Sequence, residues 1–181
     1  DFFGTAYGQQ DGKFDGFKLG DANTQFDGTL LLIEPSAANA YDDITDSSGR
    51  VVVDVCRYDR VFDQDRYGVA DSTPTLERWT IDPTAGTVDR QEIDGRGHEF
   101  PRIDPRRLGS EHRYAYTTAF ETDTSSGVQL GGVFQHDLHT GRSVTFDLGA
   151  GRWAGEAVFV PAATDSGEQE GWVLAVVYDA T

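Results

Sequence analysis

The sequence predicts an all-β chain, and three observations lead to this fold class. Short apolar runs, such as residues 51–58 and 76–81, are separated by turns rich in Gly, Asp and Pro. No segment shows the period of an amphipathic helix. A turn of the form D-x-x-x-G joins two such runs at Asp82 and recurs 55 residues later at Asp137. This spacing is close to the length of a propeller blade with long loops, although two unrelated hairpins would leave the same pattern.

The first half of the chain is expected to hold an irregular segment and then several strands. Residues 1–28 are rich in Gly, Asp and Phe, which is typical of short strands or an irregular arm. Residues 30–33, LLLI, are expected to form a short buried strand, followed by a loop over 34–49. Further strands are expected at 51–58, 76–81 and 87–93, with a polar, exposed excursion over 59–75.

The stretch 99–117, EFPRIDPRRLGSEHRYAYT, contains residues that restrict the backbone. Pro101 and Pro105 fix φ and bias the residues before them away from the helical region. Gly109 permits a turn before an alternating strand over 112–117. The residue chemistry predicts a structural loop that leads into a strand, with its arginines paired to nearby carboxylates. These arginines are Arg102, Arg106, Arg107 and Arg113.

The second half of the chain is predicted to contain the remaining strands. The second D-x-x-x-G turn is expected to connect strands at 133–136 and 142–148. The last strands are expected at 157–160 and 172–178.

The composition excludes some classes of partner. A hydrophobic content of 38% and an aromatic content of 12% are enough for a globular interior. The net charge of −16 disfavours binding to nucleic acid or to an anionic membrane surface. Only Lys13 and Lys18 are lysines, a composition that suits either solubility at high salt or a biased base composition of the gene.

Cysteine content and chain ends give further expectations. Cys56 is the only cysteine, so an intrachain disulfide and a multi-thiolate zinc site are excluded. Its place in the apolar run 51–56 predicts a buried thiol. No run approaches the roughly 20 apolar residues of a membrane-spanning helix. The first residue is Asp1, without a preceding Met, which is typical of a trimmed or partial chain.

The stretch 99–117 also resembles the central signature of the carotenoid cleavage oxygenase family, which includes lignostilbene-type and retinoid-isomerase-like members. Other phrases resemble that family in the same order along the chain: NAYDD at 39–43, VDVCRY at 53–58, LERW at 76–79, GEAVFVP at 155–161 and GWVL at 171–174. The resemblance covers the chain from about Asn39 to its end and does not include residues 1–38.

The resemblance implies a seven-bladed β-propeller with an iron at its axis. At roughly 45–50 residues per blade, 181 residues are enough for about three or four blades. The chain is therefore expected to be a partial or shortened β-propeller of the seven-bladed carotenoid oxygenase type. Residues 1–28 would form a poorly matched N-terminal segment, and residues 29–181 would form the propeller blades.

The resemblance implies an iron-dependent dioxygenase, which uses O2 to cleave a conjugated C=C bond of carotenoids, apocarotenoids or stilbenes into two carbonyl products. Members hold a ferrous iron, Fe(II), with four histidines. Ser36 stands where one of these ligands would be, and the other three positions fall outside this chain. Serine cannot replace imidazole without a large loss of affinity, so the chain alone is expected to bind no iron and to be inactive.

Glu156 resembles the family glutamate that hydrogen-bonds a ligating histidine, a second-shell position that would orient the ligand. A purely structural alternative is a carboxylate that caps a strand end or pairs with Arg152. The acidic phrase at 168–172, EQEGW, resembles a family phrase and is expected to form a structural turn.

Two alternatives to the family reading remain open. The histidines present, with Glu99 or Asp137, could form a metal site of their own, although His136 and His139 are expected to be solvated at a hairpin turn. These histidines are His98, His112, His136 and His139. The alternative function is a non-catalytic, diverged β-propeller module for binding or structure.

Partners and location follow from the resemblance. The expected partners are an apolar polyene or stilbene substrate and O2, without nucleic acid and without a transmembrane segment. The expected location is cytoplasmic, with peripheral membrane contact of the full-length protein as a further option. A partial propeller exposes unpaired strand edges, so the isolated segment is expected to be oligomeric or prone to aggregation.

Overall fold

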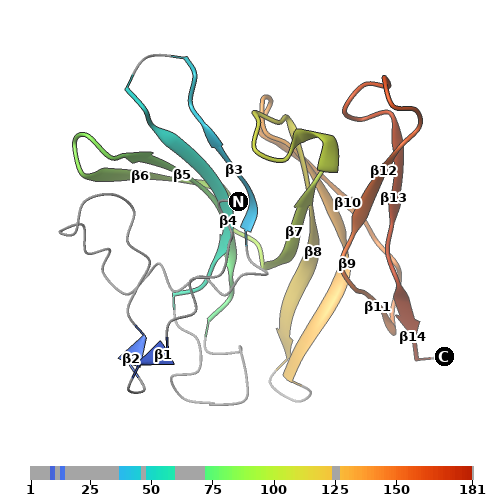
Figure 1. The fold of residues 1–181 in the computed structure, drawn as a ribbon. Coiled ribbons are helices and arrows are strands. Elements are labelled where there is room, and N and C mark those ends of the chain that lie inside the picture. Colours follow the sequence, from blue (N-terminus) through green and yellow to red (C-terminus); the bar gives the residue numbers. More distant parts are fainter. Residues whose placement is uncertain are drawn as a thin grey trace.

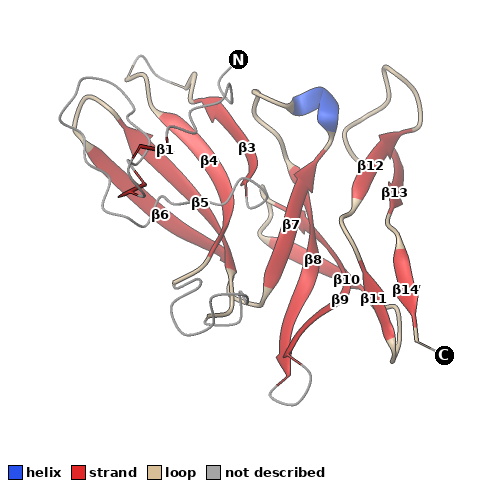
Figure 2. Ribbon diagram, turned by 60° about the horizontal axis from the view of Figure 1, so that its bottom comes forward, coloured by secondary structure: helices blue, strands red, loops and turns tan. Residues whose placement is uncertain are grey.

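The computed structural model describes residues 9–10, 13–14, 37–45, 48–59, 72–123 and 127–180. These residues form antiparallel strands and one 3-10 turn, which confirms the all-β prediction (Figure 2). The expected strand at 30–33 lies outside the described residues, as do most of 1–28 and of the excursion at 59–75.

Three antiparallel units follow one another along the chain and stand side by side (Figure 1). The first sheet is β3 (Ala37–Asp42), β4 (Val51–Arg57), β5 (Thr75–Asp82) and β6 (Thr87–Asp94), in that order. The second sheet is β7 (His98–Ile103), β8 (Tyr114–Asp123), β9 (Gly127–Asp137) and β10 (Arg142–Phe146). β3 of the first sheet lies against β7 of the second, and in the third unit β12 lies against β7 and β11 against β9. This is the arrangement of successive propeller blades around an axis.

The third unit is one interrupted hairpin. Its strands are β11 (Arg152–Ala154), β12 (Val158–Pro161), β13 (Gly171–Leu174) and β14 (Val177–Asp179). β12 pairs with β13 and β11 with β14, so both pairs belong to the same two-stranded ribbon. A separate pair, β1 (Gln9–Gln10) with β2 (Lys13–Phe14), lies near the N-terminus, and the 3-10 turn is η3 (Pro105–Arg107).

The two D-x-x-x-G turns have the same structure. The Asp82 side chain accepts the backbone N–H of Thr84 at 2.9 Å, and Gly86 has a φ of +67°. In the second turn the Asp137 side chain has the same role, and Gly141 has a φ of +68°. Each turn joins the third and fourth strands of its sheet. The repeat interpretation is therefore favoured over two unrelated hairpins.

Three strands, β3, β7 and β11, are not among those predicted. The loop predicted over 34–49 is wrong for β3, whose small and polar residues lack apolar alternation but pair with β4. The strand β7 is not predicted, because Pro101 reads as a break. Pro101 lies within an irregularity between Glu99 and Arg102, where the register shifts and Phe100 takes a φ of +50°. Proline is tolerated at such a site because no ladder hydrogen bond needs its N–H.

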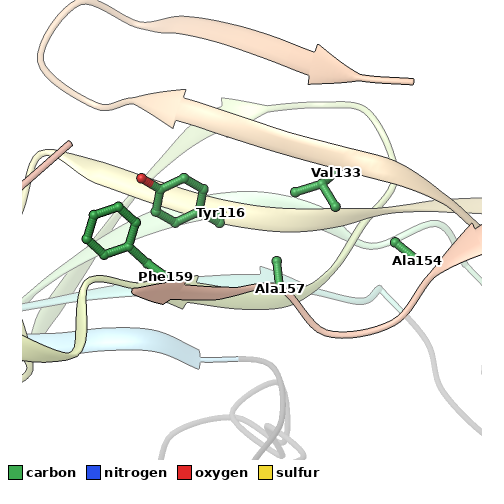
Figure 3. Packing of buried hydrophobic residues seen from close by; sticks show 5 residues of the cluster. All are labelled: Tyr116, Val133, Ala154, Ala157 and Phe159. Atoms are coloured by element: carbon green, nitrogen blue, oxygen red, sulfur yellow. The ribbon is translucent and has the colours of Figure 1, made fainter. Parts of the chain in front are cut away.

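The larger apolar cluster joins the second sheet to the third unit (Figure 3). It comprises Tyr116, Val133, Ala154, Ala157 and Phe159. The Tyr116 and Phe159 rings stack with their centroids 5.6 Å apart. The interface between the first and second sheets has a smaller apolar cluster of Ala38, Ile103 and Ala115, and much of its remaining buried surface is polar.

The loop between β7 and β8 is held from the first sheet by Asn39 of β3, which is 5% exposed. The Asn39 Nδ2 donates to the Ser110 carbonyl at 2.9 Å and lies 3.1 Å from His112 Nδ1. Its Oδ1 accepts the N–H of Gly109 at 3.0 Å, and Gly109 has the positive φ expected of a turn. One buried amide thus satisfies both donors and acceptors of a neighbouring loop.

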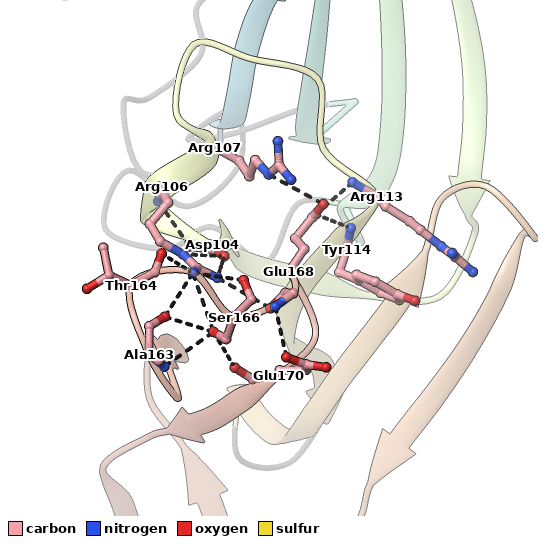
Figure 4. Close-up of polar contacts among 11 residues, drawn as sticks. Asp104, Arg106, Arg107, Arg113, Tyr114, Ala163, Thr164, Ser166, Glu168 and Glu170 are labelled. Atoms are coloured by element: carbon pink, nitrogen blue, oxygen red, sulfur yellow. Dashed lines mark hydrogen bonds and ion pairs between the residues drawn. The ribbon is translucent and has the colours of Figure 1, made fainter.

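The same loop is held from the other side by the turn between β12 and β13 (Figure 4). Arg106 Nη1 donates to the carbonyls of Ala163, Thr164 and Ser166, each at 3.1 Å. In the reverse direction, Glu168 Oε1 accepts the N–H of Arg113 at 2.7 Å and of Tyr114 at 2.8 Å. The structural-turn prediction for 168–172 agrees with this arrangement.

All four arginines of the stretch 99–117 pair with carboxylates, as predicted. The pairs are Arg102–Glu156, Arg106–Asp104, Arg107–Glu168 and Arg113–Asp137. Two of these pairs connect the stretch to the third unit, so the arginines contribute to the packing of successive units.

The apolar cluster yields a first prediction. We expect Phe159→Ala to lower the free energy of unfolding by about 3 kcal/mol, because a fully packed aromatic side chain leaves a cavity. The neighbouring Val158 is 48% exposed, and Val158→Ala should cost about 0.5 kcal/mol. Urea unfolding followed by tryptophan fluorescence measures both. Equal losses for the two variants would contradict this account of the cluster.

The amide of Asn39 yields a second prediction. We expect Asn39→Ala to lower the free energy of unfolding by about 2 kcal/mol, because the Ser110 carbonyl and the Gly109 N–H lose a buried partner. Asn39→Asp keeps the shape of the side chain but places a second acceptor against the Ser110 carbonyl. It should therefore lower the free energy of unfolding by at least as much. If Asn39→Asp is as stable as the parent chain, the hydrogen bonds of Asn39 do not hold this loop.

Candidate functional site

Two carboxylates, Glu99 on β7 and Glu156 between β11 and β12, lie where the second sheet meets a neighbouring unit. Glu156 precedes β12, is exposed, and accepts a hydrogen bond from Arg102 Nε at 2.6 Å. The structural alternative named Arg152 as its partner, and this is wrong, because Arg152 instead pairs with Asp179 at 2.9 Å. The second-shell role of Glu156 stays a prediction.

Glu99 is a buried carboxylate that sequence reasoning assigned only to a metal-site alternative. The Tyr58 hydroxyl donates to Glu99 Oε1, and the Phe100 N–H donates to Oε2 at 2.9 Å. Burial and the adjoining Glu99 carboxylate raise the pKa of Tyr58 well above its ordinary value. Tyr58 ends the phrase VDVCRY and Glu99 begins EFPR, so two phrases that carry the resemblance meet at this hydrogen bond.

His112 belongs to a buried polar network in the interface between the first and second sheets. Its Nε2 lies 3.0 Å from Asp54 Oδ2, although the contact lacks the angle of a hydrogen bond. Arg78 donates to both oxygens of Asp54, at 2.7 and 2.8 Å. Burial pushes the pKa of Asp54 up, but the hydrogen bonds from Arg78 and the contact with His112 outweigh it and hold the pKa below its ordinary value. Asp54 is therefore a buried anion with two cationic or polar partners.

His98 and His136 are also buried, on β7 and β9. The expectation that His136 is solvated is wrong. It lies one residue before the turn at Asp137, on the face of the second sheet that the first sheet covers, and it is 1% exposed. His139, two residues beyond Asp137, is exposed as expected.

Cys56 is buried as predicted. It is fully enclosed on β4, and burial raises the pKa of its thiol well above the ordinary value. A protonated, enclosed thiol is neither a nucleophile nor a metal ligand.

The described residues do not fit an iron held by four histidines. Among them, no three His, Cys, Asp or Glu side chains gather as metal ligands. His98, His112 and His136 have polar partners within the protein. Ser36, at the family ligand position, lies outside the described residues. The metal-site alternative built from these histidines therefore has no support in the described part of the chain.

In the same part of the chain, no helix has the length and apolar character needed to cross a lipid bilayer.

Comparison with known proteins gives one family. The family model described as "Retinal pigment epithelial membrane protein" matches residues 36–181. The chain is 39% identical over 140 residues to the "Carotenoid cleavage oxygenase" of Mycobacterium tuberculosis (strain ATCC 25618 / H37Rv), covering 75% of this chain and 28% of that protein. It is 31% identical over 150 residues to the "Apocarotenoid-15,15'-oxygenase" of Synechocystis sp., covering 79% of this chain and 30% of that protein.

Solved structures agree with these relatives. The chain matches cobalt-substituted Synechocystis ACO with a TM-score of 0.66 and 30% sequence identity, over 79% of this chain and 30% of that chain. The chain thus spans less than a third of the length of these relatives, and its sheets are part of a seven-bladed β-propeller of the carotenoid oxygenase type. With the family model matched over most of its length, the chain belongs to the carotenoid cleavage oxygenases, the retinal pigment epithelial membrane protein family.

Proposed function

We propose that the chain is a portion of an iron-dependent dioxygenase that cleaves a conjugated C=C bond with O2 and gives two carbonyl products. The observation that carries this proposal is the 39% identity to a carotenoid cleavage oxygenase over 140 residues. The substrate class we propose is an apolar polyene or stilbene. A "Lignostilbene-alpha,beta-dioxygenase isozyme III" of Sphingomonas paucimobilis, 28% identical over 115 residues, supports the stilbenes within this class.

We propose that this chain supplies scaffold to such an enzyme and that the iron ligands come from elsewhere in a longer protein. Residues 29–181 would form the propeller blades, with 1–28 as a separate segment, and the family match beginning at Ser36 supports a boundary in this region. Bound iron would supply O2 chemistry, whereas the residues of this chain would orient the ligands. On its own the chain would be inactive.

Glu156 is the residue that we propose for an orienting role. Its carboxylate accepts a hydrogen bond from Arg102 and has more acceptor sites than Arg102 occupies. A carboxylate of this kind can accept the N–H of a ligating imidazole and fix its ring orientation. The Arg102–Glu156 pair would thus hold the acceptor in place before a histidine from another part of the protein reaches it.

Ser36 yields the third prediction. We expect residues 36–181, placed in the Mycobacterium tuberculosis relative instead of its matched segment, to give a protein without iron or cleavage activity. The same replacement with Ser36→His should bind iron near one equivalent and cleave a carotenoid, because imidazole restores the missing ligand. Elemental analysis after anaerobic iron loading and chromatography of the carbonyl products measure both properties.

The 181-residue chain alone serves as the control and should hold iron only at background. Stoichiometric iron in the Ser36 form would show that serine is not a lost ligand. If the Ser36→His form folds and binds iron but does not cleave, the alternative of a non-catalytic propeller module is favoured.

The outer face of the third unit yields the fourth prediction. Four large side chains there are strongly exposed: Trp172 at 61%, Leu174 at 58%, Val176 at 83% and Tyr178 at 63%. This unit has two paired strands where the preceding sheets have four, so we propose that a further sheet of the longer protein covers this face. We expect the isolated chain to self-associate through it.

The double variant Trp172→Lys, Leu174→Lys should shift the chain toward monomer in sedimentation velocity, because two charges oppose burial of the face. Phe146→Lys is the matched control, since Phe146 is 51% exposed on β10 of the second sheet. A monodisperse monomer of the parent chain would contradict the prediction, and so would an equal effect of the control.

A further inference from the structure

Five polar side chains cross the second sheet in a continuous series, one from each strand from β6 to β10. We call them the histidine chain: Asp94, His98, Thr117, His136 and Ser143. His98 Nε2 lies 3.2 Å from Asp94 Oδ1, a contact that lacks the angle of a hydrogen bond, and His98 Nδ1 lies 2.9 Å from Thr117 Oγ1. Thr117 Oγ1 lies 3.0 Å from His136 Nε2, and His136 Nδ1 lies 2.8 Å from Ser143 Oγ. Because Asp94 ends the first sheet, the series connects the first and second sheets.

The chemistry of these groups allows one direction of donation through the whole series. The Asp94 carboxylate is an anion 3.2 Å from Nε2 of His98, so its charge favours the proton of His98 on that nitrogen. His98 Nδ1 is then an acceptor and takes the Thr117 hydroxyl proton. The Thr117 oxygen in turn accepts Nε2–H of His136.

The last contact of the series follows in the same way. With its proton on Nε2, His136 has an acceptor at Nδ1, which takes the Ser143 hydroxyl proton. In the opposite direction, an unprotonated Nε2 of His98 would face the carboxylate, and two acceptors would lie 3.2 Å apart. Asp94 therefore favours Nε2–H of His98 directly and reaches His136 through the Thr117 hydroxyl. Asp94 Oδ2 also lies 3.8 Å from His136 Nδ1, but that nitrogen has the nearer Ser143 hydroxyl at 2.8 Å.

We propose that the histidine chain is a proton-ordered connection between the first and second sheets. The connection holds while both histidines are neutral and protonated on Nε2, and acid releases it. The rings are packed edge to face with centroids 5.0 Å apart, and their exposed fractions are 0% for His98 and 1% for His136. A proton added to either ring would place an N–H against a hydroxyl that already donates to it. The added charge would also be buried.

The charged groups around the two rings are Asp94 and Arg96, both at the junction of β6 and β7. Arg96 donates to Asp94, and its guanidinium lies 4.2 Å from the centroid of the Phe134 ring. Burial pushes the pKa of Asp94 up, but hydrogen bonds from Arg96 and the contact with His98 outweigh it and keep the pKa low, so Asp94 stays charged between pH 7 and 5. Arg96 is a cation throughout this range and disfavours a second positive charge on the rings.

Acid sensitivity follows from the difference between the folded and unfolded chains. Burial lowers the pKa of His98, with Asp94 opposing the shift, and burial and the neighbouring His98 lower the pKa of His136 to about 3. In the unfolded chain both rings take up a proton near pH 6.5. Stability present above pH 6.5 is therefore lost as the pH falls toward 3. For His136 alone, the unfolding equilibrium constant should rise about 20-fold between pH 7 and 5.

The fifth prediction concerns the tautomers, which nitrogen-15 NMR of the histidine-labelled 181-residue chain identifies at pH 7. We expect His98 and His136 to be neutral and protonated on Nε2. In Asp94→Asn, which removes the anion, the Nδ1–H form should become populated in both rings. Asp89→Asn, at an exposed site on the same strand, should leave both unchanged. A charged or Nδ1–H ring in the parent chain, or unchanged tautomers in Asp94→Asn, would overturn the proposal.

Urea unfolding at pH 7 and pH 5 tests the acid release. The ratio of the two unfolding constants should be about 20-fold smaller in His136→Gln than in the parent chain. His139→Gln, which removes an exposed histidine beyond the same turn, should keep the parent ratio. An unchanged ratio in His136→Gln would overturn the proposal, and the parent tautomers decide it independently if that variant does not fold.

Discussion

The hydrogen bonds of the loop between β7 and β8 are the constraint on which the packing of the three units depends. This loop leads into β8, which pairs with both β7 and β9 and presents one face to the first sheet and the other to the third unit. Residues 105–111 of the loop are exposed, but both neighbouring units hydrogen-bond to its backbone groups. Asn39 does so from the first sheet and Glu168 from the third unit, and Arg106 of the loop in turn donates to carbonyls of the third unit. The stretch that carries the family resemblance is therefore also the stretch that connects the three units.

Features set by local chemistry could be predicted from the sequence. The D-x-x-x-G turns were predictable because an Asp side chain that caps N–H groups and a Gly with positive φ act within five residues. The pairing of the four arginines was predictable in kind, since an acidic chain offers many carboxylates, but not in partner. Glu156 lies near Arg152 in sequence and nevertheless pairs with Arg102, 54 residues away. Which carboxylate pairs with each arginine depends on how the units pack, and a local sequence pattern does not predict this packing.

The missed strand β3 and the misjudged histidine His136 have a common physical reason. β3 carries Asn39 where a strand would usually carry an apolar side chain, because its inward position faces polar loop groups rather than a core. His136 is polar and next to a turn, so its sequence predicts a solvated residue. In the structure a hydroxyl lies within hydrogen-bonding distance of each of its ring nitrogens. Buried polar side chains lower the apolar periodicity from which strands are predicted. Sequence reasoning is therefore weakest at an interface built from hydrogen bonds.

The two interfaces between successive units differ in a way that bears on function. The first and second sheets share ion pairs and histidines, whereas the second sheet and third unit share stacked aromatic and aliphatic side chains. Apolar contacts tolerate small displacements, but a polar series has one satisfied arrangement and fixes register more strictly. Glu99 lies next to His98 on β7, so the polar interface also sets the position of a carboxylate on a strand that faces the neighbouring units. The histidines of this chain thus order its scaffold, which leaves metal binding to other residues of the longer protein that we propose.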